Sequence, residues 1–215
     1  MVRPAAPYEH EDMAQALERN TPWQVETDGK AVPPAVVCAL NGSPPGRAAA
    51  AYAAALARAL EWRLGLVASG LRPLELPMLA QAVINEEAGV VVQPAERRGN
   101  AAAAGELALR ARVPVVVVPR RGRTQGPVHG PLVAVAVPGG AKVAGLSTRL
   151  ALALETTLQV LRAENREDVA GLVEEANTRD LGLVVIGAEH AASIRHHKLT
   201  APVMLVPADT DIRVG

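Results

Sequence analysis

The sequence predicts an α/β fold made of two similar halves, each an open parallel sheet of the Rossmann-like kind, related by a pseudo-twofold axis. Short β-branched runs bounded by turn residues alternate with Ala/Leu-rich segments of helical length, which is typical of parallel strands joined by crossover helices. The series then occurs a second time. With 215 residues, 49% of them hydrophobic, the chain can bury a core shared by both halves.

Eight buried strands are expected, four in each half. Right-handed crossovers predict the strand order 2-1-3-4 within each half. If the two last strands meet, the halves form one eight-stranded sheet; otherwise two separate sheets pack through their helices. The strands are expected at 35–40, 63–68, 89–93, 114–119, 132–137, 157–162, 182–187 and 202–207, and the helices at 47–61, 75–87, 100–112, 146–155, 166–179 and 188–196.

Three pairs of segments carry the repeat. They are diverged, and the spacing between partners shortens along the chain, which indicates small deletions in the second half. The pairs are Leu40-Asn-Gly-Ser43 with Val137-Pro-Gly-Gly140, Gly89-Val-Val-Val-Gln-Pro-Ala-Glu96 with Gly182-Leu-Val-Val-Ile-Gly-Ala-Glu189, and Pro114-Val-Val-Val-Val-Pro119 with Pro202-Val-Met-Leu-Val-Pro207.

These pairs divide the chain into segments. An N-terminal extension with a helix expected at 11–19 comes first, and a connector rich in glycine and arginine separates the halves. The predicted segments are the extension 1–34, the first half 35–119, the linker 120–130, the second half 131–208 and the tail 209–215.

Composition excludes several classes of function. The 22 Lys+Arg balance 22 Asp+Glu, and the chain has two Trp, two Tyr and no Phe. It therefore lacks the basic surface and the stacking side chains that nucleic-acid binding needs. A single cysteine, Cys38, favours a reducing compartment, and no apolar stretch reaches the roughly 18 to 20 residues of a membrane span. We expect a cytoplasmic protein that binds neither nucleic acid nor membrane.

The order of motifs resembles the universal stress protein family. A strand ends in Asn41-Gly42-Ser43 where that family has Asp-Gly-Ser, and a long Ala-rich helix follows. An acidic helix then leads into a strand of the type Gly182-Leu-Val-Val-Ile-Gly187, and a Pro-Val-x-x-Val-Pro strand closes each half. The likeness covers about residues 35–119 and 131–208.

The resemblance implies an adenine-nucleotide α-hydrolase-like fold in trimmed, tandem form. The family domain has about five strands, and here the region between the second strand and the acidic helix is too short for the usual extra helix and strand. The two halves should form an intramolecular pseudo-dimer that mimics the family's dimer, with the closing Pro-Val strands near the pseudo-twofold axis.

Nucleotide-binding members of the family carry a loop similar to Gly-x2-Gly-x9-Gly-Ser/Thr, whose glycines let backbone N–H groups approach phosphates. No two of the 18 glycines here lie three residues apart, so this motif is absent. In the second half the loop is Gly187-Ala-Glu-His190, which leaves no room for a phosphate cradle, and Glu189 would repel an anion. We therefore expect no resident cofactor.

The first half keeps a candidate adenine-nucleotide site. Where the family has an acidic residue associated with base and ribose, asparagine retains hydrogen bonding and loses the charge. Side-chain charge near a capped helix start could replace the glycine loop and hold ATP or AMP. The alternative is a purely structural role, in which Asn-Gly-Ser is a turn with a helix-capping serine and the two arginines lie at a solvated helix start. The candidate residues are Asn41, Gly42, Ser43, Arg97, Arg98, Gly99 and Asn100.

No catalytic or metal-binding set emerges from the sequence. His190 and His196 are not at the i, i+4 spacing that places two ligands on one helical face, and the five histidines are expected at the surface. Cys38 lies mid-strand and is expected to be a core residue, not a nucleophile. Adjacent carboxylates such as Glu174 and Glu175 indicate a solvated helix face.

Three functions remain open. The first is a non-enzymatic, universal stress protein-like protein that acts by binding an unidentified protein partner, with a second copy of the chain as a further partner. The second is a sensor that binds an adenine nucleotide in the first half alone. The third is a nucleotide hydrolase of the same fold group, because a fold does not decide function. The missing loop and the missing catalytic set favour the first.

Overall fold

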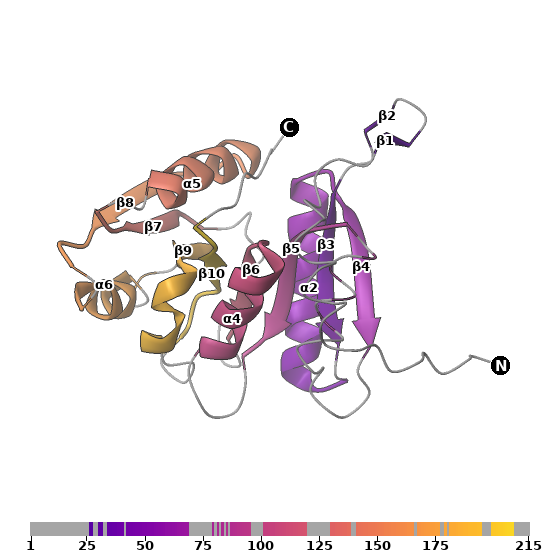
Figure 1. Ribbon diagram of the computed structural model, residues 1–215, viewed down its shortest axis with the longest axis horizontal. Helices are drawn as coiled ribbons and strands as arrows, with labels where there is room; N and C mark the ends of the chain where they lie inside the picture. Colours follow the sequence, from indigo (N-terminus) through magenta and orange to yellow (C-terminus); the bar gives the residue numbers. More distant parts are fainter. Residues whose placement is uncertain are drawn as a thin grey trace.

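The computed structural model forms one eight-stranded sheet covered by helices (Figure 1). A separate pair of two-residue strands, β1 (Glu26–Thr27) and β2 (Lys30–Ala31), precedes it. The helix predicted at 11–19 lies outside the described residues. These are 26–27, 30–31, 34–40, 42–68, 79, 81, 83, 85, 87–95, 101–119, 130–138, 141–165, 167–176, 179, 181–194 and 199–208.

All eight predicted strands are present, and no end differs from the prediction by more than one residue. The order across the sheet is β4-β3-β5-β6-β10-β9-β7-β8, so the order 2-1-3-4 is confirmed in each half. The strands are β3 (Ala35–Leu40), β4 (Arg63–Ala68), β5 (Ala88–Pro94), β6 (Val115–Val118), β7 (Leu132–Ala136), β8 (Leu158–Arg162), β9 (Leu183–Gly187) and β10 (Val203–Val206).

The two last strands of the halves meet at the centre of the sheet. β6 and β10 pair antiparallel, with Met204 opposite Val116, whereas every other pair in this sheet is parallel. Figure 1 shows β4 and β8 at the two outer ends. The prediction of one continuous sheet is therefore confirmed, and the alternative of two separate sheets is wrong.

Side chains alternate between the two faces because successive residues of a strand point in opposite directions. On one face Cys38 packs in a cluster with residues of α2 and α5; on the other, Val37 packs in a cluster with residues of α4, α6 and η2. Each face thus has its own core. The helices are α2 (Pro44–Ala59), α4 (Ala102–Ala111), α5 (Ala141–Ala153), α6 (Asp168–Ala176) and the 3₁₀-helix η2 (Ala188–Ser193).

Helix starts differ from the predictions: α5 begins at Ala141 instead of residue 146, and local capping decides two others. α2 begins at Pro44 instead of residue 47, because Ser43 caps it and proline is favoured in a first turn. α6 begins after a reciprocal capping box: Asn165 Oδ1 accepts from the N–H of Asp168 at 3.1 Å, and Asp168 Oδ2 accepts from the N–H of Asn165 at 3.2 Å. The segment expected as a helix at 188–196 is instead the short η2.

α2 and α5 end in the same hydrogen-bond pattern. After α2, the N–H of Trp62 donates to Ala57 O and the N–H of Glu61 to Arg58 O; after α5, Thr156 and Glu155 make the equivalent bonds to Ala151 and Leu152. This pair of bonds is a Schellman motif, which requires one residue in the left-handed conformation. Glutamate holds that position in both, with φ 57° at Glu61 and 49° at Glu155.

Strand register offers an alternative to one predicted pairing of segments. Ala68 and Arg162 lie seven residues beyond Glu61 and Glu155, and their strand partners are Leu40 and Ala136. Counted in this way, Leu40 corresponds to Ala136 instead of the predicted Val137. A one-residue slip moves side chains to the opposite face of a sheet. The predicted pairing of Leu40 with Val137 stays a prediction.

Helices α2 and α4 contact residues on the far side of the β6–β10 join, one on each face of the sheet. On one face, the Tyr52 hydroxyl of α2 donates to Gly182 O, 3.5 Å away, just before β9. On the other, α4 packs against η2, and a Cβ added to Gly105 would overlap the Ala191 methyl. The Ala101 N–H donates to Ile194 O at 3.1 Å beside this contact. The strand pairing is thus reinforced above and below.

Replacing Glu61 or Glu155 with glycine should raise the free energy of unfolding by about 0.5–1 kcal/mol each, because the left-handed conformation costs nothing sterically without a Cβ. Urea denaturation measures the change. Glu61→Ala is the matched control: it removes the carboxylate, keeps the Cβ and should give no such gain. An equal gain from alanine would contradict the backbone explanation.

Gly105→Ala should lower the free energy of unfolding by about 1–3 kcal/mol, because the new methyl group has no space against Ala191. The control is Gly145→Ala in α5, where an added Cβ would meet no atom within 4 Å. That change should be stabilising by about 0.5–1 kcal/mol, through helix propensity alone. Thermal melts that show the same sign for both variants would refute the close packing of α4 on η2.

Candidate functional site

Ligands of open parallel sheets bind at the carboxyl ends of the strands, where neighbouring strands diverge to opposite faces. In the first half this edge is formed by the ends of β3 and β5. Of the seven candidate residues, the structure describes Gly42 and Ser43. Gly42 is exposed and has φ +69°, a conformation that suits glycine in a turn.

Ser43 serves as the N-cap of α2, as the structural interpretation of this turn predicts. Its Oγ accepts a hydrogen bond from the Gly46 N–H at 3.1 Å. The next two residues are Pro44 and Pro45, which have no N–H, and the Arg47 N–H already donates to Ser43 O at 3.0 Å. The first turn of α2 therefore keeps no backbone donor for a phosphate.

Arg47 also closes this turn. Its Nη1 donates to Gly42 O at 3.2 Å, so the guanidinium lies beside the loop backbone at the carboxyl edge of β3. The group remains exposed. This arginine was not among the residues predicted from the sequence, although its position one turn into a capped helix places it at the same edge as Gly42.

The other five candidates lie outside the described residues: Asn41, Arg97, Arg98, Gly99 and Asn100. The two ends of the loop between β5 and α4 are described. Ala95 N–H donates to Val118 O at 2.7 Å, and Ala101 N–H donates to Ile194 O. Ala101, and not the predicted Asn100, is the N-cap of α4, and it makes no side-chain cap bond. Whether the two arginines converge on the Asn-Gly-Ser turn stays a prediction.

In the second half a carboxylate lies where a phosphate loop would begin. β9 ends at Gly187, and η2 follows without a connecting loop. Glu189 folds back over this glycine, so that an added Cβ on Gly187 would lie 2.5 Å from Glu189 Oε1. A negative charge held at this point disfavours an anionic ligand.

His190 is buried, whereas the sequence predicted a surface position. Its side chain is 5% exposed, and Nε2 lies 3.5 Å from Glu189 Oε1. Packing of η2 against α4 and α6 accounts for the burial. The other four histidines lie outside the described residues, and within the described part of the chain no cluster of His, Cys, Asp and Glu could hold a metal ion.

Cys38 is fully buried at the centre of β3, as predicted for a core residue. Burial raises the pKa of its thiol to about 12, because desolvation disfavours the thiolate. A catalytic cysteine needs the opposite shift. Burial also raises the pKa of Tyr52, whose ring fills the same core.

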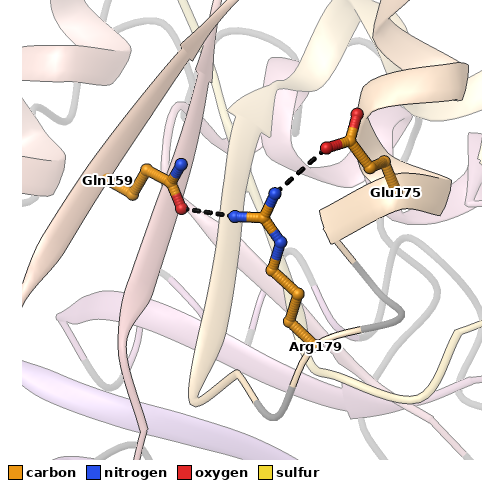
Figure 2. Close-up of polar contacts among 3 residues, drawn as sticks. All are labelled: Gln159, Glu175 and Arg179. Carbon is orange, nitrogen blue, oxygen red and sulfur yellow. Dashed lines mark hydrogen bonds and ion pairs between the residues drawn. The ribbon is translucent and has the colours of Figure 1, made fainter.

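One polar cluster could not be predicted from the sequence because its members are far apart in the chain. Arg179 donates from Nη1 to Gln159 Oε1 at 2.6 Å and from Nη2 to Glu175 Oε1 at 3.0 Å (Figure 2). The arginine thereby links the end of α6 to the edge strand β8. All three residues are exposed, and Glu175 pairs with a cation, as expected of a solvated face and not of a catalytic acid pair.

Comparison with known proteins places this fold. No family model matches the chain, and no curated protein matches its sequence. The crystal structure of a "Putative Universal Stress Protein" from Pseudomonas aeruginosa UCBPP-PA14 superposes with a TM-score of 0.51 over 81% of this chain and 93% of that chain, at 12% identity. The chain has a universal stress protein fold. Neither predicted half alone could supply 81% of the residues, so the likeness extends over both.

The universal stress protein fold agrees with the order of motifs that suggested it. The strand with Asn-Gly-Ser at its end lies inside the sheet, and the two Pro-Val strands meet at the centre.

Of the helices in the described part of the chain, none has the length and apolar character to cross a bilayer.

The Cys38 thiol gives the stability a pH dependence with a defined sign. The folded state keeps this proton to about pH 12, whereas the unfolded chain releases it near the ordinary value of 9.0. The stabilisation is therefore complete below pH 9 and falls as the pH rises toward 12, by up to about 1.4 kcal/mol per pH unit. Urea titrations between these limits should show a shallower decline for Cys38→Val. Parallel profiles for the two proteins would contradict the assignment.

Proposed function

We propose that this chain is a non-enzymatic, universal stress protein-like protein that acts by binding a protein partner and lacks the ATP-binding loop. The observation that carries the proposal is the structure at the carboxyl ends of β3 and β9, where a nucleotide would lie. In the first half Ser43, Pro44 and Pro45 leave α2 without a donor for phosphate. In the second half the Glu189 carboxylate covers Gly187.

We also propose that the chain is a tandem of two diverged halves related by a pseudo-twofold axis. The same strand order on either side of the β6–β10 pair supports this, as do the matching helix ends with Glu61 and Glu155 in the left-handed conformation. In an internal pseudo-dimer of this kind, β6 and β10 pair with each other, so neither strand is left as an edge for joining a separate sheet. The domain boundaries predicted from the sequence follow from this proposal.

The non-enzymatic part of the proposal is supported by the environments of the candidate nucleophile and acid. Cys38 is buried with a raised pKa, and Glu175 pairs with Arg179. A hydrolase would need an activated nucleophile or a metal-bound water at the strand edge. No described residue supplies either. The buried free thiol also supports a reducing compartment, for which we propose the cytoplasm.

Nucleotide titration tests the proposal directly. In thermal melts, ATP, ADP and AMP at millimolar concentration, with and without magnesium, should leave the melting temperature unchanged, because the described residues of the two strand edges form no phosphate cradle. A ligand present at about 100 times its Kd would add about 2.7 kcal/mol of stability. Mass spectrometry should find no co-purified nucleotide.

The alternative, an adenine-nucleotide sensor in the first half, predicts the opposite. It requires a specific shift that disappears in Arg97→Ala/Arg98→Ala and persists in Arg58→Ala, a control on the exposed side of α2. That result would overturn the proposal. Turnover of ATP that depends on the same two arginines would favour the hydrolase.

A further inference from the structure

The edge strand β4 exposes two leucines on one face. Leu64 is 40% exposed and Leu66 56%. They lie on the face covered by α2, opposite Val36 and Cys38 in the register of β3. α2 is built mostly from alanine, whose methyl groups are too short to cover the outer leucines. The other face of β4 is closed, since Gly65 is buried and Val67 packs against the core there.

The backbone of β4 offers hydrogen-bonding groups along the same edge. The Arg63 N–H points inward and donates to Pro34 O at 3.2 Å. Because the pleat alternates, the N–H and C=O groups of Leu64 and Leu66 point outward. β4 is the last strand on this side of the sheet. An open edge that also carries leucines is a site for pairing with another strand.

The opposite edge strand, β8, carries more polar side chains. Its Gln159 accepts a hydrogen bond from Arg179, whose guanidinium lies beside the strand (Figure 2), and Arg162 is exposed at the strand's end. β8 has one large exposed hydrophobic residue, Val160, whereas β4 has two, Leu64 and Leu66. Charged and polar side chains discourage edge-to-edge association, so of the two outer strands of this sheet β4 is the better suited to pairing.

We propose that β4 pairs antiparallel with β4 of a second copy of the chain, about a twofold axis through Gly65. In this register Leu64 lies opposite Leu66 of the partner subunit, as a hydrogen-bonded pair, and Leu66 lies opposite the partner's Leu64. The four leucines form one apolar patch over the new join. Arg63 lies opposite the partner's Val67, so that no two like charges face each other.

The order of residues in β4 favours pairing with the same strand of a second copy. A twofold interface buries the same patch on both subunits. The row Leu64-Gly65-Leu66 reads the same in both directions, so leucine meets leucine when two copies pair antiparallel. The chain's own β6–β10 pair already joins two sheets of this type in the same antiparallel manner. Because a twofold contact uses β4 of both subunits, association through β4 is complete at a dimer.

The oligomeric state of the full chain tests the proposal. Sedimentation velocity from about 1 to about 200 μM should show a monomer–dimer equilibrium. Leu66→Lys should raise the dimer Kd at least about tenfold, because it places a charge in the patch. Val160→Lys is the matched control: Val160 is 43% exposed on β8, and its substitution should leave the Kd within about twofold.

Hydrogen exchange of the wild-type chain provides a second readout that needs no variant. The amides of Leu64 and Leu66 should become protected as the concentration rises, and those of β8 should not. A monomer at every concentration overturns the proposal, as does a dimer equally sensitive to Val160→Lys. Neither outcome bears on nucleotide binding, so this test is separate from that of the proposed function.

Discussion

The antiparallel pairing of β6 with β10 is the interaction on which the rest of the structure depends. Both strands are fully buried rows of valine with one methionine and one leucine, so the apolar side chains on their two faces belong to both cores. Burial of such rows is the main favourable term in folding. Without this pairing each set of four strands would end in an open apolar edge, and the contacts of Tyr52 with Gly182 and of α4 with η2 would have no support.

The described helix starts use their own backbone N–H groups in local hydrogen bonds. The start of a helix is a natural anion site because its N–H groups are unpaired. Here the chain supplies its own acceptors: the Ser43 hydroxyl at α2, and the Asn165 and Asp168 side chains at α6. At the end of β9 it places the carboxylate of Glu189. The starts of α2 and α6 are therefore satisfied by the chain's own side chains, which is consistent with the proposed protein that acts by binding a partner.

Much of the fold could be predicted because the strong signals are local. Valine runs bounded by proline and glycine set the strand ends to within one residue, and crossover handedness then limited the strand order. The features that were missed depend on residues distant in the chain. His190 is buried by the packing of η2, and Arg179 reaches Gln159 across the sheet edge. At the candidate site, the capping role of Ser43 was predictable from the Asn-Gly-Ser-Pro-Pro turn. The N-cap at Ala101 was not, because its N–H bonds to Ile194 in the other half.

The central claim is that two four-stranded units are joined through β6 and β10, and methyl NOE spectroscopy on selectively labelled protein tests it most directly. Met204 and Val116 are cross-strand partners on the same face. Side chains of directly opposed residues in an antiparallel pair lie about 4.5–5.5 Å apart at Cβ, so the Met204 methyl group should show a strong NOE to the methyl groups of Val116. NOEs from Met204 to β9 alone, with none to Val116, would contradict the continuous sheet and with it the account of both halves.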